Sequence, residues 1–391
     1  MLTRWISGFL CVLGFVAPVR AVQEEEKPKA WYDRLDFAGD LRMRYEGFNW
    51  EGQFDEGRRD RLRYRFRVGF DIELTKSIRS GFRLRSGDPK DPVSDNQTFG
   101  GGLDKDGISL AEFYADFDIT DSVSVIAGKF DHSDYWEVSD LHWDDDVVVE
   151  GAIQRFAIRS SEGALAQIDF STYELVLEEF SSREDSWVLG FQARPTIRLD
   201  ERNELIVGAG FDSFIRPQAV VDLSLAGELT GNDVTNLLDR SGRLVSDFDI
   251  LNAFGIWNYR SSGSWPAKLL FFYYKNTGAG DEAGIDPFTG VRAVGSDNDT
   301  AYFARVEAGR YDALWRLLFR YTRYDSEPDA LLYAYLQSDT GRSSNVAGHR
   351  VDVRIGMPAR QYINVTWYNT RPKIGDDATM NRWQFDYVFR Y

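Results

Sequence analysis

The chain has 391 residues, of which 43% are hydrophobic and 15% aromatic, with a formal charge of −16 and a single cysteine. The hydrophobic content excludes a disordered chain. The acidic balance argues against a nucleic-acid partner, which needs clustered positive charge, and one cysteine excludes a disulfide framework. The mean hydropathy of −0.39 would, taken alone, exclude a membrane protein as well, but the pattern of the residues decides that question.

The first 21 residues have the features of a cleavable signal peptide. Arg4 precedes an apolar stretch at 6–16, and Val19-Arg20-Ala21 fits a small-residue cleavage site. A transmembrane anchor is the alternative, but it needs about 20 apolar residues. We therefore expect residues 1–21 to be a signal peptide, 22–34 a charged periplasmic leader, and 35–391 one domain.

Alternation with a period of two begins at residue 35. In 61–74, Leu62, Tyr64 and Phe66 occupy one parity while Arg61, Arg63, Arg65 and Arg67 occupy the other, which is the signature of a β-strand. Segments 35–46 and 381–391 alternate as clearly. Thirteen weaker segments lie between them, at 78–86, 108–119, 123–130, 151–160, 166–178, 186–199, 204–215, 248–259, 268–276, 300–308, 314–324, 348–357 and 362–370.

The connections between these strands are alternately short and long. Tight turns such as 75–77 and 120–122 contrast with long polar segments at 48–60, 87–107, 131–150, 216–247, 277–299 and 325–347. Segments 151–160 and 268–276 alternate poorly, and segment 216–247 has room for a further hairpin, so the predicted strand count is a range of two either way. Short turns on one side and long loops on the other are typical of outer-membrane barrels. We predict an all-β transmembrane antiparallel up-and-down barrel of about 16 strands (14–18).

A soluble β-sandwich or propeller is the alternative fold, because one face of a sandwich also alternates. Three observations favour the barrel. Large aromatics dominate the apolar parity, dense arginine occupies the polar parity, and the chain closes on an aromatic strand. No motif recurs at the spacing of propeller blades.

Several stretches resemble the bacterial outer-membrane porins of the "putative porin" family. The matching stretches are GDLRMRYEG (39–47), RLRYRFRVGFDIEL (61–74), GFRLRSGDPKDPVSDNQTFGG (81–101), VIAGKFD (125–131), HWDDDVVVEG (142–151) and DALLYAYLQSD (329–339). Alginate-export barrels are more distantly similar. The resemblance implies a passive channel for small hydrophilic solutes and ions. Phe385, Tyr387, Phe389 and Tyr391 resemble the closing-strand signal that the barrel-assembly machinery recognises.

The candidate site is the inner face of the first three strands. It carries eight arginines: Arg42, Arg44, Arg61, Arg63, Arg65, Arg67, Arg83 and Arg85. Adjacent strands lie about 4.8 Å apart, so these guanidinium groups would form one basic wall that needs water, counter-ions or carboxylates nearby.

The third long segment supplies the expected carboxylates, Asp131, Asp134, Glu137, Asp140, Asp144, Asp145 and Asp146, with Tyr135, Trp136, Leu141 and Trp143 among them. Aromatics suggest that this loop folds into the lumen and narrows it, with its acids toward the arginines. The alternative is that the acids are solvated and that the arginines pair locally with Asp36, Asp40, Asp71 and Glu73.

Other classes of function leave little trace in the sequence. No metalloprotease, nucleophile-elbow or phosphate-loop motif is present, so we expect no enzyme, cofactor or metal. A channel for an acidic polysaccharide and a non-conducting structural or adhesion barrel remain open. The expected surroundings are outer-membrane lipid and lipopolysaccharide. Barrels of about 16 strands often form trimers, but no clear trimer face is present, so a homotrimer stays open.

Overall fold

The computed structural model describes residues 31–51, 58–100, 102, 105–182, 184–263, 265–375 and 378–391. The chain divides into two units, Met1–Arg34 and Leu35–Tyr391. In the first unit, Trp31–Arg34 forms the 3-10 turn η1. The predicted signal peptide and the leader up to residue 30 lie outside the described residues.

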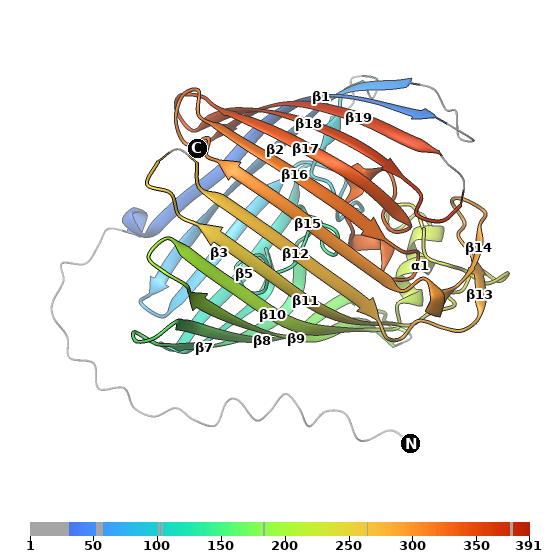
Figure 1. Ribbon diagram of the computed structural model, residues 1–391, viewed down its shortest axis with the longest axis horizontal. Helices are drawn as coiled ribbons and strands as arrows, with labels where there is room; N and C mark the ends of the chain where they lie inside the picture. Colours follow the sequence, from blue (N-terminus) through green and yellow to red (C-terminus); the bar gives the residue numbers. More distant parts are fainter. Residues whose placement is uncertain are drawn as a thin grey trace, which may run out of the picture. The chain divides into compact units, whose positions relative to one another are not determined.

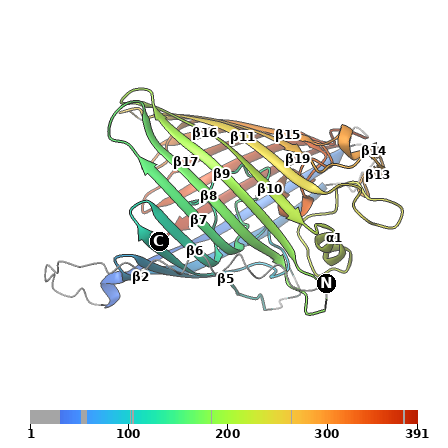
Figure 2. The ribbon, with the colours of Figure 1, turned by 90° about the horizontal axis from the view of Figure 1, so that it is seen from below.

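The second unit is a closed antiparallel β-barrel (Figures 1 and 2). Within the described residues it has sixteen barrel strands, and the short β4 pairs with β2 as an addition. The strands are β1 (Leu35–Glu51), β2 (Arg58–Thr75), β3 (Ile78–Arg85), β4 (Gln97–Thr98), β5 (Ser109–Thr120), β6 (Val123–Phe130), β7 (Val149–Arg159), β8 (Leu165–Glu178), β9 (Ser186–Arg198), β10 (Asn203–Ile215), β11 (Phe248–Tyr259), β12 (Ala267–Asn276), β15 (Thr300–Gly309), β16 (Leu317–Ser326), β17 (Val346–Gly356), β18 (Gln361–Arg371) and β19 (Thr379–Arg390). All sixteen predicted strands are confirmed, with boundaries shifted by up to five residues.

Pairing of β1 with β19 closes the barrel. The register runs from Asp40 opposite Arg390 to Glu51 opposite Thr379. Closure leaves the sheet without a free edge. A free edge would be unfavourable in a membrane, because its unpaired backbone groups would have no water to hydrogen-bond with.

The two faces of the barrel wall have opposite polarity. On β1, Leu41 and Met43 are exposed, whereas Arg42 and Arg44 are buried. The same arrangement recurs on β19, where Phe385 is exposed between buried polar neighbours. A soluble sandwich buries its apolar face. The exposed apolar outer face and buried polar inner face are therefore those of a barrel that lies in lipid.

Short and long connections segregate to the two ends of the barrel. Turns at 76–77, 121–122, 160–164, 199–202, 260–266, 310–316 and 357–360 form the short-turn end. The long-loop end holds the described parts of the connections at 86–108, 131–148, 179–185, 216–247, 277–299, 327–345 and 372–378. The alternation predicted from the sequence is confirmed, with 179–185 and 372–378 as shorter members of the long-loop set.

The long loops have some secondary structure of their own. Segment 216–247 forms the helix α1 (Gln218–Leu225) and an isolated antiparallel bridge between Leu238 and Leu244, and 277–299 forms the hairpin β13 (Ala283–Ile285) and β14 (Arg292–Val294). Both views show α1, β13 and β14 at the same end of the barrel (Figures 1 and 2). Among the described residues, no helix has the length and apolarity needed to cross a membrane.

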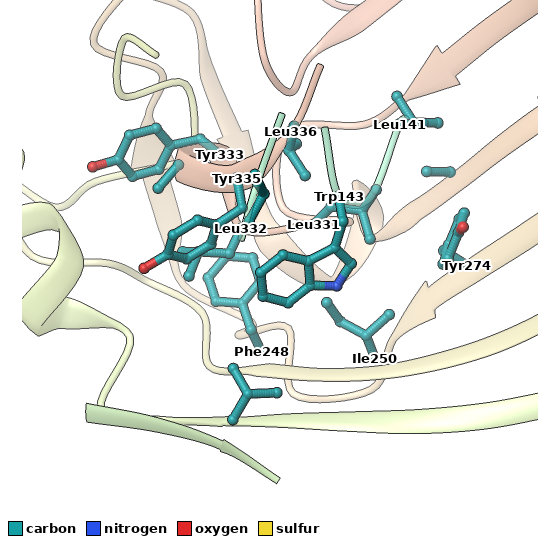
Figure 3. Close-up of a cluster of buried hydrophobic side chains, with 14 of the residues drawn as sticks. Leu141, Trp143, Phe248, Ile250, Tyr274, Leu331, Leu332, Tyr333, Tyr335 and Leu336 are labelled. Atoms are coloured by element: carbon teal, nitrogen blue, oxygen red, sulfur yellow. The ribbon is translucent and has the colours of Figure 1, made fainter. Parts of the chain in front are cut away.

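The apolar core lies inside the barrel toward the long-loop end. Leu331, Leu332 and Leu336 of the 327–345 loop are fully buried against Trp143 and Phe248 (Figure 3). Full burial of one such leucine stabilises the fold by about 1.5–3 kcal/mol. The loops that form this core are therefore part of the folded interior.

Candidate functional site: the lumen of the barrel

The eight predicted arginines lie together on the first three strands. Arg42 of β1 is opposite Arg65 of β2, Arg44 is opposite Arg63, and Arg67 is opposite Arg85 of β3. Their strands pair in chain order, so the geometry places these side chains on one wall. The strict alternation of β2 is what gives them a common face.

Carboxylates from neighbouring strands neutralise most of this wall. Arg44 contacts Asp386 at 2.6 Å, Arg65 contacts Asp40 at 3.0 Å, and Arg85 contacts Glu112 at 2.6 Å. Arg61 pairs with Glu46, Arg67 with Asp40, and Arg83 with Glu112. Each of these partners lies on the same strand or an adjacent one, as the alternative of local pairing expected.

Only one of the four carboxylates expected for local pairing takes part. Asp40 binds both Arg65 and Arg67. Asp71 instead accepts a 2.6 Å hydrogen bond from the Tyr114 hydroxyl, and Asp36 and Glu73 are exposed and have no ion pair within the described residues. The other carboxylates that pair with the wall from neighbouring strands are Glu46, Glu112 and Asp386. The register of β1 against β19 places Asp386 directly opposite Arg44.

Arg42 and Arg63 differ from the other six, because neither has a carboxylate within 4 Å among the described residues. Arg42 donates to Asn96 Oδ1, and Arg63 donates to Ser94 Oγ at 3.4 Å and to the Asn96 carbonyl oxygen. Each residue is only 9% exposed, and each Nε is buried without a hydrogen-bond partner among the described residues. Within the described residues, the positive charge of these two arginines is therefore not held in a direct ion pair.

The 131–148 loop folds into the lumen and is fixed to the wall at widely separated strands. Asp146 lies 3.3 Å from Arg65 on β2, Asp140 lies 2.6 Å from Arg305 on β15, and Glu137 lies 3.1 Å from Arg194 on β9. Five strands separate β2 from β15 and three separate β15 from β9 around the barrel. A segment with these three anchor points crosses the interior of the barrel.

The seven acids of this loop do not all face the basic wall. Asp146 does, whereas Asp140 and Glu137 bind arginines elsewhere. Asp131 accepts a hydrogen bond from the Ser133 amide, and Asp144 accepts hydrogen bonds from the amides of Asp146 and Ser338. The remaining two acids, Asp134 and Asp145, are exposed. The prediction that all seven face the arginines is geometrically too broad, because ion pairs draw individual acids to different strands.

The environments of Asp144 and Asp146 push their pKa values apart. Burial raises the pKa of Asp144 well above its usual value, and the charge of Asp146 adds to this rise. Burial opposes ionisation of Asp146 too, but Arg65 and Arg67 more than compensate and lower the pKa of its carboxyl. The negative charge of the pair therefore sits on Asp146, beside the basic wall.

Aromatic contacts hold the loop in place. Trp136 stacks on Tyr173 of β8 with ring centres 4.5 Å apart, and Trp143 stacks on Tyr335 at 5.2 Å. Tyr135 and Leu141 are buried as well. The four apolar residues that suggested an inward loop are all packed in the interior.

A second loop, at 327–345, also folds into the barrel, and the sequence did not lead us to predict it. Residues 330–336 are buried, and its Asp339 pairs with Arg382 at 2.6 Å and with Arg44 at 3.4 Å. The Asp144 amide donates to the Tyr335 carbonyl oxygen at 2.8 Å, which joins the two inward loops. The apolar run at 331–336 could have indicated this path, because apolar side chains in a long loop favour packing inside the barrel, as the aromatics of 131–148 did.

The four aromatics of the closing strand lie on the outer face. Phe385, Tyr387, Phe389 and Tyr391 are each about two-fifths exposed, on the parity opposite to Arg382 and Asp386. The Tyr391 hydroxyl donates to the Arg67 carbonyl oxygen at 2.9 Å, and its ring passes over Gly39, where a Cβ atom would lie 2.6 Å from Tyr391 Cζ. Glycine at 39 therefore leaves room for the last aromatic ring.

The three histidines of the chain lie in the 131–148 loop and on β17. His132 and His142 are buried in the 131–148 loop, and His349 Nδ1 is 2.7 Å from the Tyr321 hydroxyl. No group of three or more candidate metal ligands occurs among the described residues.

Comparison with known proteins agrees with this geometry. A family model described as a putative porin matches residues 54–230, a range that contains four of the six stretches on which the resemblance rests. No functionally curated protein matches the sequence.

Two solved porin structures share the fold. OprB of Pseudomonas putida, in a high-pH structure, has a TM-score of 0.55 and 12% identity, over 92% of this chain and 95% of its own. OmpF of Salmonella typhi, in a complex with daunomycin, has a TM-score of 0.54 and 9% identity, over 93% of this chain and 99% of its own. The resemblance to the "putative porin" family is thus confirmed: residues 54–230 match its model, and the chain has the fold of the outer-membrane porins.

Proposed function

We propose that this barrel is a passive outer-membrane channel for small hydrophilic solutes and ions. One observation carries the proposal: a closed wall with a lipid-compatible outer face surrounds a charged interior, across which the 131–148 loop is fixed by ion pairs. A loop that is held by side-chain ion pairs narrows the pore, and within the described residues its backbone does not pair with the wall strands to close it. Selection by size and charge then follows from the groups that remain around it.

The electrostatic part of the proposal rests on Arg42 and Arg63. Six of the eight wall arginines are paired, so within the described residues the positive charge of the wall that is not held in a direct ion pair lies on these two side chains. Asp146 supplies negative charge from the loop side. A field between them would orient polar solutes and favour small anions.

The fold also supports a proposal for which end of the barrel faces the periplasm and for the membrane in which the protein lies. We place the short turns in the periplasm and the long loops outside the cell, as in bacterial outer-membrane barrels. Export by the predicted signal peptide, assembly through the closing aromatic strand, and contact with lipopolysaccharide belong to the same proposal. A catalytic role is no part of it.

A non-conducting structural or adhesion barrel is the second candidate. The observation that favours it is the apolar cluster of the 327–345 and 131–148 loops, which occupies the interior near the long-loop end. A channel for an acidic polysaccharide has less support, because a strand of sugar residues would have to pass a loop that is anchored to three sides of the wall.

Planar lipid bilayers separate these candidates. Purified protein refolded in detergent should produce discrete conductance steps in KCl if it is a channel. Uronic-acid oligomers should leave the steps intact if small solutes are the substrates, whereas strong block at low concentration would favour the polysaccharide channel. Correctly folded protein that gives no steps would favour the structural barrel.

A further inference from the structure

A separate cavity opens at the short-turn end of the barrel. Its volume is about 980 Å³, within the range of small-molecule sites. Arg310 and Tyr311 line it from the 310–316 turn, Arg360 from the 357–360 turn, Tyr362 from β18, and Arg390 from β19. None of the eight arginines of the basic wall takes part.

Two tyrosine rings and two guanidinium groups form a stacked arrangement beside this cavity. Tyr311 and Tyr362 meet edge to face with their centres 5.0 Å apart. The guanidinium carbon of Arg390 lies 5.2 Å from the Tyr362 ring centre, and that of Arg354 lies 5.4 Å from the Tyr311 ring centre. Arg390 donates from one nitrogen to the Tyr311 hydroxyl at 3.4 Å, and its other donors can still face a carboxylate, because an arginine that stacks on a ring keeps the edge of its guanidinium plane free.

The positive charge of the lining is not neutralised by its own acids. Glu307 pairs with Arg320 at 2.9 Å, and Asp312 pairs with Arg316 at 3.0 Å. Arg310, Arg360 and Arg390 have no ion-pair partner within the described residues. Arg310 donates to the carbonyl oxygens of Ser261 and Gly263, and its Nε is buried without a partner.

Apolar surface adjoins these cations. Leu318, which is 8% exposed, lines the cavity together with Met357 and Pro358. A ligand that uses both parts of the lining needs an oxyanion for the guanidinium groups and a flat apolar body for the tyrosines and the aliphatic side chains.

We propose that this cavity binds small aromatic carboxylates and is a solute site at the periplasmic mouth of the channel. The oxyanion lies between Arg360 and Arg390, and the ring of the solute packs near Tyr311, Tyr362 and Leu318. The role as a solute site rests on the proposed channel function, whereas the binding itself depends only on the cavity.

Titration calorimetry of the detergent-solubilised protein with benzoate tests the binding. The variant carrying Arg360→Gln and Arg390→Gln should raise the dissociation constant at least about tenfold, because it removes two charged donors. A variant with Arg198→Gln and Arg202→Gln removes the same charge at the same end, outside the cavity, and should bind like the unmodified protein. Arg360→Gln alone, in an exposed turn, should weaken binding even if β19 variants fold poorly.

The probes distinguish the chemistry of the ligand. Acetate and benzyl alcohol, which each lack one half of benzoate, should bind more weakly than benzoate. Inorganic phosphate that binds as tightly as benzoate would overturn the assignment to aromatic carboxylates, and so would equal benzoate affinity in the cavity and control variants. Conductance steps without benzoate binding would defeat this inference alone, whereas absence of steps would defeat the channel function.

Discussion

Asp140 of the 131–148 loop accepts a 2.6 Å hydrogen bond from Arg305 on β15, and both side chains are shielded from solvent. The same carboxylate contacts Arg350 on β17 at 3.4 Å and the Tyr324 hydroxyl at 3.2 Å. One aspartate therefore ties the middle of the inward loop to three neighbouring strands, β15, β16 and β17.

Asp140→Asn should destabilise the barrel and loosen the loop. The change leaves Arg305 without its anionic partner inside the protein, which costs about 3 kcal/mol in comparable buried pairs. Urea unfolding in lipid vesicles should show the loss, and single-channel traces should become noisier. Asp134→Asn, an exposed acid of the same loop, is the control and should change neither quantity. Equal stability of the two variants would contradict the anchoring role.

Removal of Arg42 and Arg63 should reduce anion preference more than removal of a paired arginine. The variant with both residues changed to Gln loses the two guanidinium groups of the basic wall that have no carboxylate within 4 Å among the described residues. Arg83→Gln is the comparison, since the carboxylate it leaves behind still pairs with Arg85. Reversal potentials under a KCl gradient measure the effect, and equal shifts per charge removed would show that pairing does not matter.

The selectivity should depend on pH through Asp91 in the 86–108 loop. Burial raises the pKa of Asp91 to about 6, although a hydrogen bond from the Val93 amide and the charge of Arg63 oppose that rise. As the pH falls from 7 to 5, the carboxyl gains a proton and loses its negative charge, so anion preference should increase.

Asp91→Asn should reduce that pH response, because its side chain is uncharged at both pH values. Asp239→Asn is the control: hydrogen bonds from the Arg243 amide and the Ser241 hydroxyl lower the pKa of Asp239, so it stays ionised over this range. Reversal potentials at pH 5 and pH 7 give the comparison. A response that is identical in unmodified protein and in both variants would exclude Asp91 as its source.

Phe389→Ser should lower the fraction of chains that assemble into the barrel. Phe389 lies opposite Leu41 across the β1–β19 seam, on the exposed face. Phe319→Ser changes an equally outward aromatic on β16, away from the seam, and is the matched control. Folded and unfolded bands after electrophoresis without boiling measure assembly. A comparable loss in both variants would mean that lipid contact, and not the closing strand, is responsible.

The alternation of polar and apolar residues was sufficient to predict the fold. Arg61, Arg63, Arg65 and Arg67 fall on one parity of β2, and local periodicity alone determines which face they occupy. The segregation of short turns and long loops followed from spacing in the same way. Both are properties of consecutive residues, which a sequence records directly.

The ion pairs inside the lumen could not be predicted in the same way. Arg44 binds Asp386 and Asp339, which are 342 and 295 residues distant in the chain. Only the closure of β1 against β19 and the inward path of the 327–345 loop bring these groups together. Residue types indicated that carboxylates were needed near the arginines, but register and loop path decided which ones.

Single-channel recording in planar bilayers is the most direct test of the central claim, that the barrel conducts and that the 131–148 loop controls its width. The unmodified protein should give discrete conductance steps that increase with KCl concentration, and Asp140→Asn should change their size or stability while Asp134→Asn does not. Protein that migrates as a folded barrel yet gives no steps, or steps identical in all three proteins, would contradict the account.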